Sequence, residues 1–483
     1  MKYLCLVMML ALGLAATASA EQETLWSRTY GGPGADGSKS LIRTYDGGFA
    51  LVGYTFSQGA GEADVYLVKT DAAGNFAWDR AYGGPGRDYG YDLCQCPDGG
   101  YLLVGQTSSF GAGLDDLYLI KTDADGDLIW QTTFGGAQID AGHAICAGPD
   151  DHYVLCGSTE SQGAGLSDVW VIKVNADGQE VWSQTFGGTE SDRGTDILAA
   201  TAGGYVALGA SGSYSANRDV HVIRIGEDGS ETWSRNLGGA SDCDWGRSVC
   251  ETSDGGFVVA GHGDIHSNDL TDVILLKLDA QGRDLWMQRF GESTFYDYGR
   301  GVCTTLDGGF LICGAVTIAE TGKHEAYVIK TDSAGRLSWS YQIGAAGSDW
   351  TSAVVETGPG SYVLAGHTDS YGAGRFDAWL VGLHDPLPQG AEPAEDPGSA
   401  IMLASSNPVS AGATIRFALT KASEVELVIV DTTGREVSTL VDGPREKGMH
   451  TIDWHPDAQA SGVYYAVLRV NGSARSRRLV VLN

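Results

Sequence analysis

The sequence predicts an all-β protein, a seven-bladed β-propeller followed by a small β-sandwich. Three observations lead to this prediction. A tryptophan recurs every 51–53 residues between positions 26 and 339, each repeat contains four short strand-like runs, and the repeat stops after position 384. Glycine supplies 70 of the 483 residues, about twice its usual share of ~7%, which argues against a mostly helical chain.

The first 20 residues have the pattern of a secretory signal peptide. Lys2 is positively charged, residues 4–14 form an apolar run, and Ala18-Ser19-Ala20 has the small residues of a cleavage site. The apolar run is short for a membrane-spanning helix of ~20 residues, and no later segment is apolar enough to cross a bilayer. We therefore expect cleavage near Ala20 and a secreted protein without a transmembrane segment.

The repeat occupies residues 24–384 in seven copies, and such regular spacing is typical of a repeat architecture. In the second copy the strand-like runs are Tyr91–Cys96, Tyr101–Gln106, Leu117–Thr122 and Leu128–Phe134. Four antiparallel strands per ~50 residues are typical of a propeller blade, and a stacked solenoid is the alternative. The repeat tryptophans are Trp26, Trp78, Trp130, Trp182, Trp233, Trp286 and Trp339.

The phase of the repeat predicts how the ring closes. If each tryptophan strand is the outer strand of the blade before it, the chain starts with an unpaired outer strand at residues 24–30. The last blade, at residues 354–384, then lacks an outer strand. We expect these two segments to pair, because closure leaves no open sheet edge.

Two repeated motifs carry a resemblance to known propellers. The turns Lys69–Trp78 and Lys121–Trp130 resemble the tryptophan-docking turn of quinoprotein-type propellers. The Asp-Gly-Gly-Tyr-Leu-Leu-Val-Gly motif at residues 98–105 is similar to short repeats of secreted bacterial propeller proteins. The resemblance implies that the repeat tryptophans have a structural role between neighbouring blades. No segment resembles the quinone-binding residues, so the resemblance implies no dehydrogenase activity.

The composition changes after the repeat. Residues 385–399 are rich in proline and acidic residues and read as a linker. Residues 400–483 hold 9 Lys+Arg and 8 Asp+Glu, so the propeller and linker carry almost all of the net charge of −30. Strand-like runs follow at residues 414–419, 425–431, 436–440, 450–454, 462–470 and 478–482. Their number and length predict a small β-sandwich.

This tail resembles the Ig-like sorting domain of type IX (Por-type) secretion substrates and the related Ig-like domain of flagellar hook-capping proteins. The matching segments include Asn407-Pro408, Thr414–Phe417, Asp431–Arg435, Gly462–Tyr465 and Arg478–Leu482. The resemblance implies an Ig-like fold for residues 400–483 and the type IX secretion machinery as a partner. It also implies passage across the outer membrane to the cell surface. A plain Ig-like accessory domain is the alternative.

The net charge and the spacing of the cysteines limit the possible partners and the possible roles of the cysteines. With 31 Lys+Arg against 61 Asp+Glu, nucleic acid is excluded as a partner, because its phosphates require a basic face. Cys146/Cys156 and Cys303/Cys313 each flank a short turn and allow a disulfide in an exported protein. They also fit small buried apolar residues, which we favour because Cys94 and Cys250 repeat only the first position.

Two sets of acidic residues recur at fixed phase. One lies at the entry to each blade, just before the first strand-like run, and the other opens the third strand. They allow two interpretations: a Ca²⁺ site built from clustered oxygens, or caps on local backbone N–H groups. The second is favoured because the acids occur in every copy. The first-strand set is Asp36, Asp88, Asp140, Asp192, Asp244, Asp297 and Asp349, and the third-strand set is Asp64, Asp116, Asp168, Asp219, Asp272, Glu325 and Asp377.

The residue after each first-strand aspartate varies between copies, and variable positions on a regular scaffold often bind ligands. Four of them are aromatic and form, with their aspartates, a candidate platform for a glycan or an extended peptide. Packing between blades is the alternative. The candidate ligand-binding residues are Tyr89, Trp245, Tyr298, Trp350, Asp88, Asp244, Asp297 and Asp349.

Other chemical motifs are weak. His262, Asp264 and His266 alternate along one segment and are candidate zinc ligands, although solvated loop histidines are the favoured interpretation. GxSxG, HExxH and P-loop motifs do not occur in the sequence. We therefore expect a monomeric, non-enzymatic secreted or cell-surface binding or display protein that needs no cofactor. The alternatives are a carbohydrate-active hydrolase or lyase that uses acids at the propeller mouth, and a purely structural surface or adhesion component.

Overall fold

The computed structural model describes two compact units, Met1–Pro386 and Leu387–Asn483. The described residues are 24–214, 217–238, 244–264, 271–291, 296–318, 321–385, 400–403, 413–419, 422–431, 436–455, 462–470 and 473–481. The predicted signal peptide and residues 386–399 of the predicted linker lie outside them. The described residues form strands and turns, and they include no helix of the length and apolarity that would cross a membrane.

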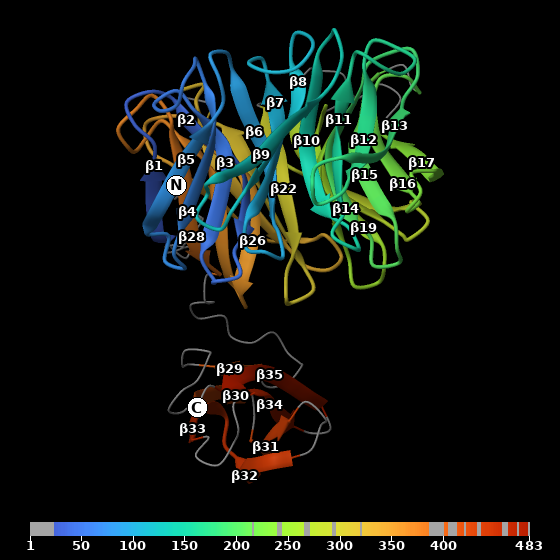
Figure 1. Cartoon of the computed structure of the whole chain (residues 1–483). Coiled ribbons are helices and arrows are strands. Elements are labelled where there is room, and N and C mark those ends of the chain that lie inside the picture. The colour runs from blue at the N-terminus through green and yellow to red at the C-terminus, as the bar shows by residue number, and fades with distance from the viewer. Residues whose placement is uncertain are drawn as a thin grey trace, which may run out of the picture. The chain divides into compact units, whose positions relative to one another are not determined.

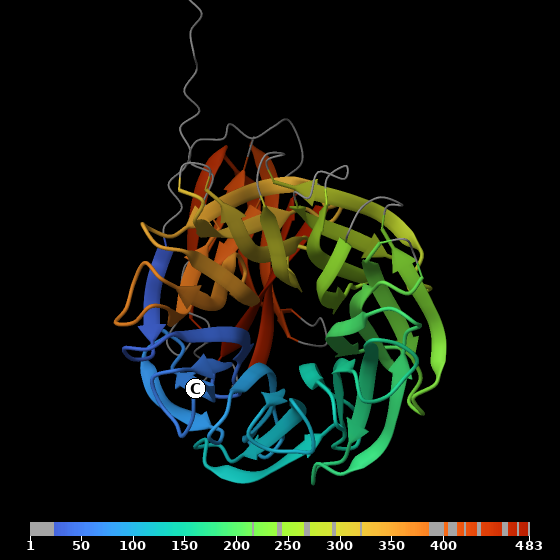
Figure 2. The same cartoon turned by 90° about the horizontal axis from the view of Figure 1, so that it is seen from above.

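The N-terminal unit is a propeller of seven four-stranded antiparallel sheets around a central axis (Figures 1 and 2). The first strands of neighbouring blades contact one another and are innermost. Blades 1 and 2 contain β2 (Asp36–Arg43), β3 (Phe49–Thr55), β4 (Asp64–Thr70), β5 (Phe76–Tyr82), β6 (Asp88–Gln95), β7 (Tyr101–Thr107), β8 (Asp116–Thr122) and β9 (Leu128–Phe134). Blades 3 and 4 contain β10 (Asp140–Ala147), β11 (Tyr153–Thr159), β12 (Asp168–Val174), β13 (Glu180–Phe186), β14 (Asp192–Ala199), β15 (Tyr205–Ser211), β16 (Asp219–Ile225) and β17 (Glu231–Leu237).

The remaining blades follow the same order, except that the last takes its outer strand from the start of the chain. Blades 5 and 6 contain β18 (Asp244–Glu251), β19 (Phe257–Asp264), β20 (Thr271–Leu278), β21 (Asp284–Phe290), β22 (Asp297–Thr304), β23 (Phe310–Thr317), β24 (His324–Thr331) and β25 (Leu337–Ile343). Blade 7 contains β26 (Asp349–Gly358), β27 (Ser361–Thr368), β28 (Asp377–His384) and β1 (Thr24–Tyr30). The predicted all-β propeller is confirmed.

Ring closure depends on the two ends of the repeat. β1 pairs antiparallel with β28, with Trp26 opposite Gly382 and Tyr30 opposite Ala378. The prediction that the N-terminal strand completes the last blade is confirmed by this register. The pairing removes the two strand edges that an open array would expose.

The repeat tryptophans contact the next blade. A Cβ built on Gly126 of blade 2 would lie only 2.6 Å from Cζ3 of Trp78, which belongs to blade 1. Gly126 also has φ of 78°, a conformation that glycine adopts without strain. In the last such position, Trp339 Nε1 donates a hydrogen bond of 3.0 Å to Asp385 Oδ1. The motif therefore joins each tryptophan to a turn of its neighbour.

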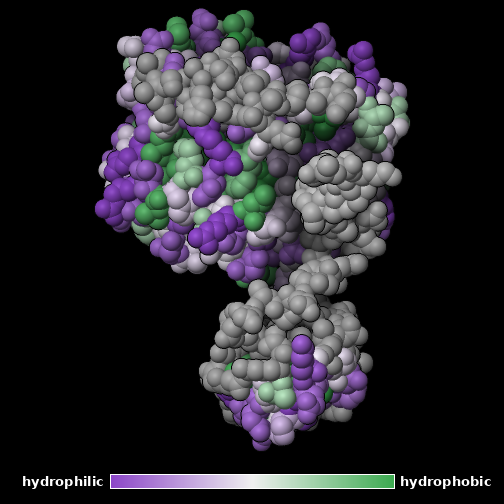
Figure 3. All heavy atoms as spheres, turned by 180° about the vertical axis from the view of Figure 1, so that it is seen from behind, coloured by the Kyte–Doolittle hydropathy of each residue, from purple (hydrophilic) through white to green (hydrophobic). Residues whose placement is uncertain are grey.

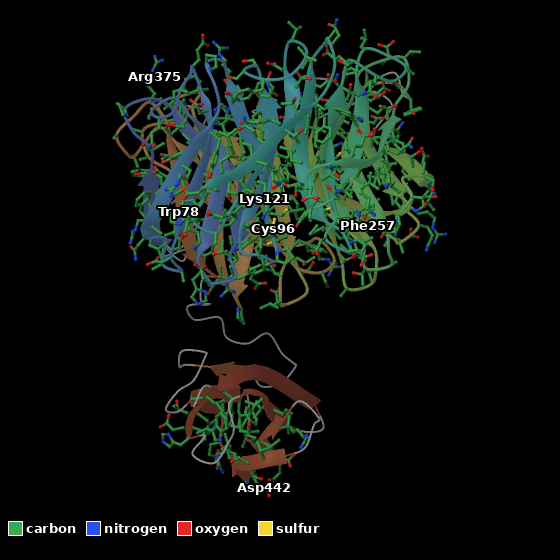
Figure 4. All side chains as sticks on the ribbon, viewed as in Figure 1. Trp78, Cys96, Lys121, Phe257, Arg375 and Asp442 are labelled. Atoms are coloured by element: carbon green, nitrogen blue, oxygen red, sulfur yellow. The ribbon has the colours of Figure 1, made fainter. Side chains whose placement is uncertain are left out.

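A buried lysine ties the Asp-Gly-Gly turn to the third strand. Lys121 Nζ lies 2.8 Å from Asp98 Oδ2, and Figure 4 shows Lys121 and Trp78 within the propeller. Lys69–Asp46, Lys277–Asp254 and Lys330–Asp307 repeat the same ion pair. The turn aspartate thus caps a cation that would otherwise be buried alone.

The inner strands start earlier than the hydrophobic pattern predicts. β6 begins at Asp88, not at Tyr91, because a bulge between Gly90 and Asp92 interrupts the alternation of side chains. At the bulge, a Cβ on Gly105 of β7 would overlap the carbonyl oxygen of Tyr89. This close backbone approach explains the glycine that recurs in the second strand of every unit.

The C-terminal unit is a β-sandwich of two sheets. One contains β29 (Ala400–Leu403), β30 (Ala413–Leu419) and β33 (Gly448–Trp454). The other contains β32 (Glu436–Arg445), β31 (Ser423–Asp431), β34 (Gly462–Val470) and β35 (Ser473–Val481). Phe417, Leu427 and Leu468 belong to one buried cluster drawn from both sheets. The predicted β-sandwich is confirmed.

All seven described cysteines are free thiols. Cys146 is opposite Val154, whereas Cys156 is opposite Ala144, so the two are offset by two positions along the paired strands. Cys303 and Cys313 show the same offset. Cys5 and Cys243 lie outside the described residues.

The outer surface of the propeller is mixed in character. Figure 3 shows hydrophilic and hydrophobic residues interspersed over the described surface on this side of the molecule. Phe76, Leu128 and Leu337 of the outer strands are about half exposed, at 56%, 49% and 54%. Single exposed apolar residues of this kind are ordinary on a protein surface.

Candidate ligand-binding site at the propeller axis

The first-strand aspartates are fully buried and bind their own blades. Asp88 accepts hydrogen bonds from the N–H of Gly84 at 2.8 Å, from Ser109 Oγ at 2.6 Å and from Thr107 Oγ1. Asp349 has equivalent partners in Ala345, Ser370 and Thr368. These carboxylates therefore hold together the turns at the start of each inner strand.

The other two candidate aspartates are equally buried. Asp297 Oδ1 accepts the N–H of Thr317 at 3.4 Å. Asp244 Oδ1 lies 3.7 Å from a guanidinium nitrogen of Arg289 on the outer strand of the same blade. Both side chains thus point toward groups of the scaffold.

The third-strand acids make similar local contacts. Asp116 Oδ2 accepts the N–H groups of Ala112 and Gly113 at 2.8 and 3.3 Å. Asp168 accepts those of Ala164 and Gly165. In the part of the chain that the structure describes, no three His, Cys, Asp or Glu side chains are grouped to hold a metal ion. The geometry fits the capping interpretation, and the calcium site stays a prediction.

Three of the four predicted aromatic residues belong to one cluster across blades 5–7. The ring centroids of Tyr298 and Trp350 are 5.3 Å apart. His262 links Tyr298, at 5.2 Å, to Trp245, at 6.5 Å. The ring centroid of His324 lies 4.3 Å from that of Trp350. The side chains of three blades therefore form a continuous aromatic and imidazole cluster.

Tyr89 lies apart from this cluster. Its ring contacts Tyr54 at 5.7 Å, in an edge-on arrangement between blades 1 and 2. Further round the ring, Tyr91 lies 5.3 Å from His143, and Arg193 donates a hydrogen bond of 2.7 Å to His143 Nε2. Aromatic and basic side chains thus continue along the inner strands of blades 1–4.

Cations accompany the aromatic rings. The guanidinium carbon of Arg300 lies 4.7 Å from the ring centroid of Trp350. The ring of Trp245 has two such neighbours, Arg218 at 4.4 Å and Arg247 at 5.0 Å. These are distances at which a cation is attracted to the face of an aromatic ring.

The cations of different blades meet near the axis. Lys39 belongs to blade 1, yet Arg300 of blade 6 and Arg247 of blade 5 both act on it. Burial and these two positive charges lower the pKa of Lys39 from 10.5 to about 8. Burial, Arg300 and Arg193 likewise lower the pKa of Arg247 to about 10. Positive side chains from different blades therefore lie close enough to act on one another.

Two positions on each inner strand define this site, which we call the axial site. The first level is the residue directly after the first-strand aspartate, and the second level is the residue two positions further. These positions contain four cations and no acid, in a chain with 61 Asp+Glu and 31 Lys+Arg. The positions are Gly37, Tyr89, Ala141, Arg193, Trp245, Tyr298 and Trp350 at the first level, and Lys39, Tyr91, His143, Thr195, Arg247, Arg300 and Ser352 at the second. The negative charge of the propeller is excluded from its axis at these levels.

Two histidines that pack against residues of the axial site are held neutral. Burial, Arg247 and Arg300 lower the pKa of His262 to about 3, and burial, Lys39 and Arg300 do the same for His367. His262 therefore contributes to the aromatic cluster. The side chain of Asp264 and all of His266 lie outside the described residues, so the zinc site stays a prediction.

Sequence reasoning identified the first level and missed the second. The first level lies directly after each aspartate, whereas Lys39, Arg247 and Arg300 lie two positions further along their strands. Aligning the seven copies at that phase reveals three cations in a mostly acidic chain. What the alignment does not show is that these side chains meet across the ring.

A separate hollow of about 360 Å³ lies beside β1 and β5. Its lining includes Arg28, Tyr30, Phe76 and Asp79. The Asp79 carboxylate already accepts a hydrogen bond of 2.7 Å from the Tyr66 hydroxyl. We therefore place the candidate site at the axis, where Lys39, Arg247 and Arg300 form no ion pair within the described residues.

Comparisons with known proteins leave the function open. No model of a known protein family matches the chain. The chain is 29% identical over 193 residues to the regulatory protein FlaEY of Caulobacter vibrioides, a match that covers 34% of this chain and 20% of that protein. The chain thus spans about a fifth of this curated relative.

Similar solved structures share little sequence with the chain. The WD40 domain of Neurospora crassa Pan2 has a TM-score of 0.44 and 10% identity, covering 73% of this chain and 90% of that one. PorZ of Porphyromonas gingivalis, a surface component of the type IX secretion system, has a TM-score of 0.43 and 12% identity, covering 94% and 60%. A protein of unknown function from Dyadobacter fermentans has a TM-score of 0.45 and 10% identity, covering 75% and 98%.

Proposed function

We propose that this chain is an exported binding protein whose ligand-binding site is the axial site of the propeller. The observation that carries the proposal is the continuous cluster formed by Trp245, His262, Tyr298, His324 and Trp350 on three blades. Aromatic faces bind the apolar face of a sugar ring, and neighbouring polar groups bind its hydroxyls. A glycan is therefore the ligand class that this surface supports best.

Binding is supported over hydrolysis by the acids at the same end of the inner strands. Glycoside hydrolysis requires two carboxyl groups free to act on the scissile bond. Asp88 and Asp349 instead accept hydrogen bonds from main-chain N–H and hydroxyl groups of the scaffold. We therefore assign these acids to stabilising the blades, and the ligand contacts to aromatic and basic side chains.

The cellular location of the protein is part of the proposal. The signal peptide at residues 1–20 and the likeness of residues 400–483 to Ig-like type IX sorting domains support export to the cell surface. In this scheme the C-terminal unit binds the secretion machinery and the propeller binds the ligand. In a bacterium that has a type IX secretion system, the chain without residues 400–483 is expected to stay in the periplasm, as detected by immunoblotting of cell fractions.

A glycan array tests the binding function. The full chain is expected to bind a subset of glycans, and Trp350→Ala is expected to weaken that binding by about tenfold or more, as for an aromatic anchor at the centre of a site. Tyr45→Ala is the matched control, because Tyr45 is 70% exposed and lies on the turn after β2, beyond the end of the strand that is away from Gly37 and Lys39. Equal binding by Trp350→Ala and the unaltered chain would exclude the axial site.

A further inference from the structure

We infer that the ligand of the axial site is an acidic sugar, a pyranose unit whose carboxylate binds Lys39, Arg247 and Arg300. This inference rests on the proposed function and specifies the class of ligand. It is argued from three features of the site: uncompensated positive charge, buried donors without partners, and cations fixed beside aromatic rings.

The first feature is uncompensated charge. Among the described residues, none of Lys39, Arg247 and Arg300 forms an ion pair, although the chain has a net charge of −30. The positive charges that act on Lys39 are those of Arg300 and Arg247. Like charges brought together in a partly buried place destabilise the free protein, and an anion at their centre offsets that repulsion.

The second feature is a pair of unsatisfied donors. The Nε atoms of Arg247 and Arg300 are buried and have no hydrogen-bond partner within the described residues. Buried N–H groups nearly always have a partner in folded proteins. A carboxylate accepts several hydrogen bonds at once and pairs well with guanidinium groups. A bound carboxylate therefore offsets the positive charge of these two guanidinium groups.

The third feature joins the acid to a sugar ring. Arg300 lies over Trp350, and Trp350 contacts Tyr298, so a cation and two aromatic rings lie within one short span. A uronate presents a flat ring face and a carboxylate within a single unit, which matches this spacing. Cations from blades 1, 5 and 6 act on one another near the axis, so one negative group between them offsets all three charges, which favours one acidic unit over an extended acidic peptide.

Titration calorimetry on the full chain tests the inference. The probes are digalacturonate and its dimethyl ester, which keeps both rings but removes both charges, together with diglucuronate and tetraglutamate. We expect the uronates to bind, the ester to bind at least about tenfold more weakly, and 0.5 M salt to weaken uronate binding. Trp350→Ala is expected to weaken binding of every sugar.

Charge variants locate the carboxylate. Arg300→Gln, Arg247→Gln and Lys39→Met are each expected to weaken uronate binding about tenfold or more while leaving the ester unaffected. Lys39→Arg is expected to retain binding because it keeps the charge. Arg375→Gln is the matched control, since Arg375 is exposed on a loop at one end of the propeller (Figure 4). Melting curves of each variant show whether the propeller is folded.

The outcomes separate this inference from the proposed function. If neutral glycans bind as tightly as uronates, and the charge variants bind normally while Trp350→Ala does not, the binding function stands and the acidic ligand is refuted. If tetraglutamate binds and the uronates do not, the ligand class is refuted. If no sugar binds and Trp350→Ala changes nothing on a glycan array, both proposals fail.

Discussion

Replacing Lys39 by methionine is expected to stabilise the propeller at neutral pH. Lys39 is partly buried beside Arg300 and Arg247, and burial with these charges lowers its pKa from 10.5 to about 8. One pKa unit corresponds to about 1.4 kcal/mol, so keeping Lys39 charged in the folded state costs up to about 3 kcal/mol. Methionine fills a similar volume without the charge and removes most of that cost.

The pH dependence gives the sharper test. Between about pH 8 and 10.5 the unfolded chain keeps a proton on Lys39 that the folded chain has lost. The unfolded state then binds more protons, so the free energy of unfolding of the unaltered protein rises with pH in this window. Lys39→Met lacks this titration. Its advantage is therefore expected to be largest at pH 7 and to shrink toward pH 10.

Thermal unfolding of both proteins between pH 6 and 10 measures the effect, which is expected to be a few degrees in melting temperature at pH 7. Lys121→Met is the control, because Lys121 is also buried but pairs with Asp98 at 2.8 Å. That variant is expected to be destabilised. If Lys39→Met melts lower than the unaltered protein at pH 7, or if its difference is the same at every pH, the repulsion argued at the axis is refuted.

Three further predictions concern the scaffold. Trp78→Ala is expected to lower the free energy of unfolding by about 2–4 kcal/mol, because it removes the contact with Gly126. Gly126→Ala should also destabilise the propeller, because φ of Gly126 is 78° and the new Cβ meets Trp78. Urea unfolding measures both, and a Gly126→Ala variant of unchanged stability would contradict the packing. Deleting residues 24–30 exposes the edge of β28 and is expected to lower the melting temperature and promote association, seen by light scattering; an unchanged monomer would argue against closure by β1. Burial raises the pKa of Asp196 to about 7, so the folded state binds the extra proton and this residue makes stability fall as pH rises from about 4 to above 7. Asp196→Asn should therefore be relatively more stable than the unaltered protein at pH 8 than at pH 5, and a constant difference in melting temperature would refute this.

The repeated features of the molecule could be derived from the sequence because they depend on local spacing. The tryptophan period, the Asp-Gly-Gly turns and the alternation of apolar residues predict the strands and their pairing, and the phase predicts closure by β1. In blade 2 the inner strand begins at Asp88, three residues before the start at Tyr91 that the pattern predicts. The reason is the bulge between Gly90 and Asp92, which breaks the alternation of side chains on which such predictions depend.

The candidate site could be predicted only in part from the spacing of the repeat. Tyr298 and Trp350 follow their aspartates at the same phase, so the sequence identifies them as candidates, and their variation marks a position free of the repeat's constraints. Whether they meet depends on the angle between neighbouring blades. The structure brings them to 5.3 Å, yet directs Tyr89 toward Tyr54 on the other side of the ring.

The sequence by itself determined the architecture and the acidity of this protein, because both arise from one motif copied seven times. The tertiary structure decided where the charge lies. The side chains of the repeated aspartates point into their own blades. Lys39, Arg247 and Arg300 come together at the axis, although they are separated by up to 261 positions in the chain. The physical reason is ring closure: only when blade 7 pairs with β1 do blades 1, 5 and 6 face one another, and only then do single cations become one site.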